Sequence, residues 1–234
     1  MNDFFLKYYN TIALSVEILA AVVGLLYYKK YKLTTAKFFI WFLVYLAVCD
    51  VLGSYVNHVE NGFLNFLNGT KLARNFWWST LYWKIGAICF FTFFFAKILI
   101  NRVLRKIIIA YGLFFLLFSI LYILCNWNAY FMRFFPIISV LGAVQIFLCT
   151  VFYFLETLLS DSILTFYKSI NFYVSAAIFI WWLIITPLIF YDIYHSYKDW
   201  NFIFLKWQIY LFANLLMYLT FTFAIPWCKP ENEL

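Results

Sequence analysis

Seven long apolar runs, separated by short polar or basic segments, fill almost the whole of this 234-residue chain. A helix that crosses the hydrocarbon core of a bilayer needs about 20 mainly apolar residues. The pattern predicts such spans at about 10–28, 38–57, 78–100, 105–125, 135–158, 170–191 and 205–227. We therefore expect an all-α, polytopic membrane protein, a seven-transmembrane-helix bundle that forms a single transmembrane domain over residues 1–234.

Composition strengthens this interpretation and narrows the expected partners. Hydrophobic residues make up 67% of the chain and charged residues 12%, whereas soluble domains carry about 25% charged residues. The formal net charge of +7 does not indicate a nucleic-acid partner, because Lys and Arg lie at the ends of the apolar runs, where they set topology. The expected partner is the lipid bilayer, and the bias toward Phe, Ile, Asn and Lys favours a bacterial inner (cytoplasmic) membrane.

The basic residues between the runs predict an orientation. Short loops rich in Lys and Arg stay in the cytoplasm. Two such loops join the first to the second run and the third to the fourth, with Lys29, Lys30, Lys32, Lys37, Arg102, Arg105 and Lys106. The N-terminus is then expected outside and the C-terminus in the cytoplasm, although the outer segments also carry Lys71, Arg74, Arg133 and Lys198.

Three ionisable residues lie inside predicted spans, where such side chains are rare and usually functional. Glu17 and Asp50 are about seven residues from the outer ends of the first and second spans, and Lys84 is about six residues into the third. At about 1.5 Å per residue, all three are predicted in one layer about 10 Å below the outer boundary. Two acids against one base leave this layer negative, so we expect one acid to be protonated or a cation to be attracted.

Two interpretations of this layer remain open. It can be structural, with a salt bridge and hydrogen bonds joining the helices, and Lys84 can also extend toward the headgroups without meeting the acids. It can instead form a ligand or ion pocket that opens to the outside. The candidate ligand-binding residues in and near the layer are Glu17, Asp50, Lys84, Gln145, Gln208 and Asn214.

A second polar group lies on the predicted inner side. Glu156 and Asp161, with Lys168, surround the loop between the fifth and sixth runs. Solvated helix ends explain such residues, but the loop can also dock a separate membrane or cytoplasmic protein, and the two acids are our candidate docking residues.

Signatures of enzymes and cofactors are missing from the sequence. The two histidines, His58 and His195, are far apart, and none of the five cysteines forms a CxxC pair. No P-loop, HExxH or GxSxG motif is present, so we expect a non-enzymatic protein without a cofactor or metal. Trp77, Trp78, Tyr82 and Trp83, at the start of the third run, are interpreted as interfacial residues.

One stretch resembles a known group of proteins. It runs from Phe152-Tyr153-Phe154-Leu155-Glu156 through Asp161-Ser162-Ile163-Leu164 to Trp181-Trp182 and Thr186-Pro187-Leu188-Ile189-Phe190. It is similar to a group of uncharacterised bacterial seven-transmembrane-helix proteins, which have a basic first inner loop and an acid near the end of the fifth span. In layout these are similar to the seven-span sensor modules of histidine kinases.

These observations predict a membrane sensor or accessory subunit. It would bind a small ligand, ion or lipid in the outer-leaflet polar layer and signal to a separate partner, because no output domain of its own is evident. The alternative is a channel or transporter that uses the same polar layer. The Phe-rich inner halves of the spans, such as 90–95, disfavour a continuous polar path.

Overall fold

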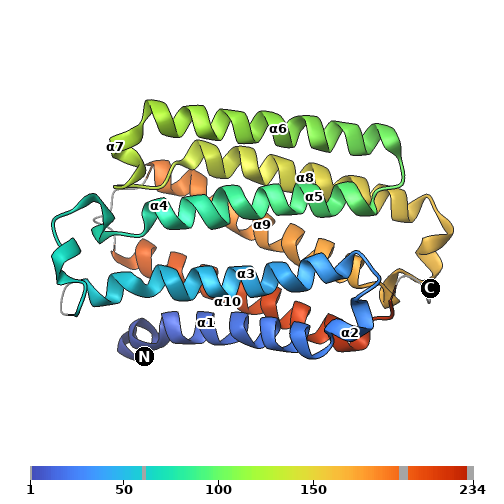
Figure 1. The fold of residues 1–234 in the computed structure, drawn as a ribbon, viewed down its shortest axis with the longest axis horizontal. Coiled ribbons are helices and arrows are strands. Elements are labelled where there is room, and N and C mark those ends of the chain that lie inside the picture. Colours follow the sequence, from blue (N-terminus) through green and yellow to red (C-terminus); the bar gives the residue numbers. More distant parts are fainter. Residues whose placement is uncertain (1, 60–61, 195–199, 231–234) are drawn as a thin grey trace.

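The computed structural model describes residues 2–59, 62–194 and 200–230, and over these ranges it is helical without a β-strand (Figure 1). Within these ranges, seven segments are long and apolar enough to cross a membrane, as the hydrophobic pattern predicts. Six of them are built on the long helices α1 (Asn2–Leu26), α3 (Ala36–Gly53), α6 (Arg102–Cys125), α8 (Pro136–Leu158), α9 (Ile170–Tyr194) and α10 (Trp200–Trp227).

The third membrane-spanning segment, Phe76–Ile98, is composite. It begins with the short helix α4 (Phe76–Ser79), continues as the π-helix η4 (Thr80–Ala87) and ends with α5 (Ile88–Ile98). Short elements connect the spans: α2 (Tyr28–Tyr31), α7 (Trp127–Tyr130) and the 3₁₀ turns η1 (Ser54–His58), η2 (Asn65–Leu67), η3 (Lys71–Ala73), η5 (Asp161–Leu164) and η6 (Phe166–Lys168).

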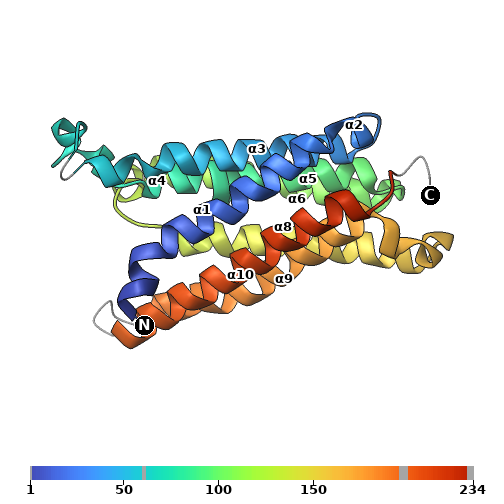
Figure 2. The ribbon, with the colours of Figure 1, turned by 90° about the horizontal axis from the view of Figure 1, so that it is seen from below.

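The helices run along one long axis, which gives the bundle two ends (Figure 1). One end, the α7 end, holds the start of α1, η1 to η3 and α7. The other, the α2 end, holds α2, the connection 99–101, η5, η6 and the end of α10. Figure 2 shows α1 running obliquely from near the start of α10 toward α2. It packs against both α3 and α10.

Aromatic side chains share the interior with Ile, Leu and Ala, and they are among its largest fully buried side chains. Phe39 of α3 is fully buried and meets Phe221 of α10 edge to face, with ring centroids 4.9 Å apart. Phe94 and Phe95 of α5 are also fully buried. Edge-to-face rings add attraction to the area they bury, so the Phe-rich part of the third span forms core between helices.

The α2 end is closed by contacts between α2 and the end of α10. The buried Tyr31 hydroxyl lies 2.7 Å from the carbonyl oxygen of Ile225 and 2.9 Å from that of Cys228. Lys30 Nζ donates to the carbonyl oxygen of Pro226 at 2.8 Å. The last carbonyls of a helix lack partners within the helix, and cations are favourable near them. These contacts therefore fix the end of α10 to the connection between α1 and α3.

Candidate functional site: a buried acid pair between four elements

Glu17 and Asp50 are brought together where α1 packs against α3. The Glu17 side chain is only 3% exposed, and Asp50 is half-buried. Their two carboxyl groups lie close enough to interact directly. Because an ionised carboxylate can only accept hydrogen bonds, a hydrogen bond between the two groups would need a proton on one of them.

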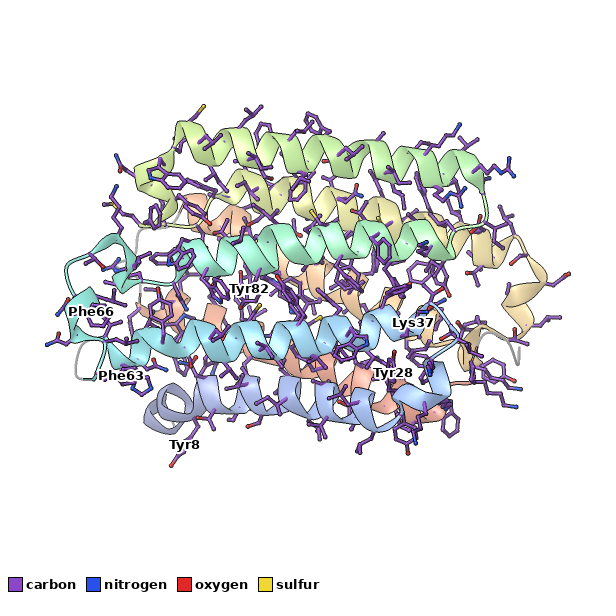
Figure 3. All side chains as sticks on the ribbon, in the orientation of Figure 1. Tyr8, Tyr28, Lys37, Phe63, Phe66 and Tyr82 are labelled. Carbon is purple, nitrogen blue, oxygen red and sulfur yellow. The ribbon has the colours of Figure 1, made fainter. Side chains whose placement is uncertain are left out.

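Two tyrosines from other elements complete the site. The Tyr82 hydroxyl of η4 donates to Asp50 Oδ1, and the Tyr218 hydroxyl of α10 lies beside Glu17. Figure 3 shows Tyr82 between the α4–α5 segment and α3. We call Glu17, Asp50, Tyr82 and Tyr218 the acid–tyrosine cluster. It joins α1, α3, η4 and α10 and presents only oxygen atoms as polar groups.

Contacts at the end of α3 place Tyr82 against Asp50. Trp78 Nε1 donates to the carbonyl oxygen of Cys49 at 2.8 Å, and Asn75 Nδ2 donates to that of Gly53 at 3.1 Å. A Cβ atom on Gly53 would lie 3.0 Å from Trp78 Cδ1, so glycine permits this close approach. The α4 helix is thereby attached on both sides of Asp50, one turn before Tyr82.

The π-helix changes which residue of the third span faces the acids. A π-helix has i→i+5 hydrogen bonds, and such segments occur frequently at functional sites. Within η4, Tyr82 faces Asp50, whereas Lys84 Nζ donates to Ser139 Oγ of α8 at 2.6 Å and lies 4.4 Å from the centroid of the Phe134 ring. The interpretation of Tyr82 as an interfacial residue did not include this contact with Asp50.

Both acids lie within candidate membrane-spanning segments, as the sequence predicts. Glu17 is in Tyr8–Leu26 and Asp50 is in Ala36–His58. The charged and titratable groups that interact with the acid pair from neighbouring positions are Tyr9, Cys49, Tyr82 and Tyr218.

The remaining predicted ligand-binding residues lie in other surroundings. Gln145 of α8 is fully buried and donates to Thr92 Oγ1 at 2.8 Å and to the carbonyl oxygen of Ile108 at 2.9 Å. Asn214 accepts a hydrogen bond from Trp181 Nε1 at 2.7 Å. The Gln208 side chain is exposed on α10. The contacts of Gln145 join α5, α6 and α8, and the contact of Asn214 joins α9 and α10.

The two predicted docking residues differ from each other. The Glu156 carboxylate accepts hydrogen bonds from the backbone amides of Ile100 and Asn101, at 2.9 and 2.6 Å. It therefore fixes the connection between α5 and α6. Asp161, in η5, is exposed at the same α2 end of the bundle. His195 and Lys198, noted in the sequence, lie outside the described residues.

Metal sites and relatives add no further identification. Over the described ranges, no group of three or more His, Cys, Asp and Glu side chains is placed to hold a metal ion. Comparisons with protein-family models, curated proteins and solved structures gave no match. The resemblance to bacterial seven-span proteins and to kinase sensor modules therefore stays a prediction.

Proposed function

We propose that this chain is a non-enzymatic membrane sensor whose Glu17–Asp50 pair binds a proton or a monovalent cation. The close approach of these two carboxyl groups, one buried and one half-buried, inside membrane-spanning segments is the observation that carries the proposal. Like charges in a low-dielectric site repel strongly. Loss of the shared proton would separate the two carboxylates unless a cation took its place. The pair is thus suited to exchange a bound proton for a monovalent cation.

The chemistry of the cluster supports a hard cation. Carboxylate and hydroxyl oxygens are ligands that hard cations prefer, whereas soft metals prefer sulfur. Glu17 and Asp50 supply carboxylate oxygens, and Tyr82 and Tyr218 supply hydroxyl oxygens. With both acids ionised, one monovalent cation would leave a single negative charge, and the two tyrosine hydroxyls can donate to it.

Helix α10 provides a physical route from the cluster to the α2 end. Tyr218 of α10 contacts Glu17, and two turns later the carbonyl groups of Ile225 and Pro226 hold Tyr31 and Lys30. A change in the spacing of the acid pair would shift α10 against α1. That shift would reach the α2 end through these hydrogen bonds.

The α2 end is the proposed cytoplasmic side of a bacterial inner membrane. The basic loops that predict topology, 29–37 and 102–106, lie at this end (Figure 1). We accordingly place the N-terminus outside and the C-terminus in the cytoplasm. A separate membrane or cytoplasmic protein would receive the signal here, with the exposed Asp161 as the better docking candidate, because Glu156 is bound to the α5–α6 connection.

The position of Glu17 and Asp50 inside membrane-spanning segments favours a transporter as the second candidate. Ionisable groups inside membrane-spanning helices are typical of proton and ion pathways, and both acids lie inside such segments. In that case the exchange at the pair would drive translocation of an ion or solute instead of a signal to a partner.

Thermal unfolding of the purified full chain tests the proposal. Measurements in NaCl, KCl and choline chloride across pH 6 to 9 would detect cation binding, because a ligand at about 100 times its Kd stabilises by about 2.7 kcal/mol. We expect stabilisation by a small cation at the higher pH values, and its loss in the Glu17→Gln, Asp50→Asn double variant. Equal stability in all salts at every pH would contradict the proposal. Selective flux in liposomes would favour the transporter.

A further inference from the structure

A groove of about 370 Å³ lies on the outer surface of the bundle between α3 and the η4–α5 segment. Its walls are aromatic rings from both sides, including Phe38 and Trp41 of α3 and Phe93 of α5, and Gly86 of η4 also lines it. Trp41 is 54% exposed and Phe93 is 42% exposed. Since α3 and α5 belong to membrane-spanning segments, the groove faces the lipid.

Ring packing gives the groove a fixed shape. Phe42 and Phe90 stack with centroids 3.8 Å apart, and Phe38 meets Phe93 edge to face at 5.2 Å. Opposite α3, Gly86 leaves room because it has no side chain, and a Cβ atom there would lie 3.1 Å from the Tyr45 hydroxyl. Rigid aromatic walls of this kind bind apolar chains without losing much rotamer freedom of their own.

Two lysines stand at the α2 end of the groove. Lys37 Nζ lies 5.2 Å from the centroid of the Phe38 ring, and Lys97 Nζ lies 5.7 Å from that of Phe93. Figure 3 shows Lys37 beside α3 toward the α2 end. Both residues are near the ends of their membrane-spanning segments, Ala36–His58 and Phe76–Ile98, at the level of lipid headgroups. Neither ammonium group pairs with a carboxylate in the described part of the chain.

We infer that this groove binds an anionic glycerophospholipid, with an acyl chain along the aromatic walls and the phosphate held by Lys37 and Lys97. The apolar walls match the chain, and the two cations at the headgroup level match the negative charge. A second copy of the protein is a poorer occupant. In a parallel twofold dimer, the same surface patch meets itself, which would bring the two pairs of lysines to the same depth of one interface.

The inference does not depend on the acid pair, which is a separate, buried site. Basic residues near an anionic membrane surface contribute about fivefold each to lipid binding. Removal of both lysines from the groove should therefore reduce retention of the anionic lipid by about 25-fold, provided that the two contributions are independent.

Native mass spectrometry of the full chain in detergent tests this site. The protein would be mixed with equal amounts of phosphatidylglycerol and phosphatidylcholine that carry the same acyl chains. We expect preferential retention of one phosphatidylglycerol. The preference should disappear in the Lys37→Gln, Lys97→Gln variant, whereas Trp41→Ala should weaken retention of both lipids by removing one wall.

Matched variants distinguish lipid binding in the groove from a general electrostatic attraction of the anionic lipid. Lys29→Gln with Lys106→Gln removes the same charge from exposed positions at the same end of the bundle and should leave retention unchanged, as should Glu17→Gln. Equal losses in the two double-lysine variants would overturn the inference. Equal retention of both lipids by the unsubstituted protein, or a stable lipid-free dimer, would also overturn it.

Discussion

The carboxyl groups of Glu17 and Asp50 meet across the contact between α1 and α3. One shared proton would hold these two consecutive spans together here, and two tyrosines extend the cluster to η4 and α10. Helix α10 is far from α1 and α3 in the sequence. A change in the charge of this pair is therefore expected to act on the packing of α1, α3 and α10.

Substitution of Glu17 by Gln and by Ala should have different effects. The Gln amide can donate to Asp50 without a shared proton, so Glu17→Gln should retain stability and lose sensitivity to cations. Glu17→Ala removes the partner of Asp50 and Tyr218 and should lower the free energy of unfolding by about 1–3 kcal/mol. Thermal unfolding in detergent measures both variants. Equal destabilisation by Gln and Ala would show that the carboxyl–carboxyl contact is not formed.

Removal of the Tyr82 hydroxyl should weaken the cluster without changing core volume. Tyr82→Phe deletes the hydrogen bond to Asp50, and polar contacts between membrane helices contribute about 0.6 kcal/mol each. Tyr122→Phe is a matched control, because this half-buried tyrosine of α6 packs against Phe118 and Phe135. Only Tyr82→Phe should alter the response to cations. An unchanged response would separate Tyr82 from the site.

Glu156 should act on the α5–α6 connection. Glu156→Ala leaves the amides of Ile100 and Asn101 without their carboxylate acceptor, and loss of hydrogen bonds to a charged group costs about 1–3 kcal/mol. Hydrogen exchange should therefore accelerate at residues 100 and 101, while Asp161→Ala leaves it unchanged. If exchange at these amides is the same in both variants, the carboxylate does not fix this connection.

Cys228 should be nearly inert to alkylation at neutral pH. It is fully buried, and burial raises the pKa of its thiol to about 11, while the nearby Lys30 ammonium group lowers the pKa by a smaller amount. The thiolate is the reactive form, so labelling should accelerate as the pH rises toward 11. Lys30→Gln should raise the pKa further and slow labelling at each pH.

Peptide mass spectrometry after timed maleimide treatment gives the rate for each cysteine. The exposed Cys125 at the end of α6 provides an internal comparison in the same sample. If Cys228 is labelled at pH 7 as fast as Cys125, the α2 end is not closed around Cys228.

The sequence predicts the seven apolar helices and one common layer for Glu17 and Asp50, because length and rise per residue determine depth in the membrane. It does not predict which face a residue presents. The π-helix η4 turns Tyr82 toward Asp50 and places Lys84 beside Ser139. A tyrosine at the start of a span fits the interfacial pattern equally well, so its inward position depends on packing that no single-sequence pattern shows.

Tyr218 carried a stronger signal in the sequence than Tyr82. It lies inside the apolar run of the last span, well away from either end, where a hydroxyl group needs a partner. The sequence carried no such signal for the role of Glu156. Its backbone acceptor role depends on the conformation of residues 99–101, which becomes visible only when α5, α6 and α8 are placed together.

Infrared difference spectroscopy of the reconstituted protein tests the shared proton most directly. A protonated carboxyl group absorbs at a frequency distinct from that of a carboxylate and shifts in deuterated water. We expect this band in the unsubstituted protein at neutral pH, its loss when a bound cation replaces the proton, and its absence in the Glu17→Gln, Asp50→Asn variant. A band that persists in the double variant, or that is missing from the unsubstituted protein, would contradict a proton held between Glu17 and Asp50.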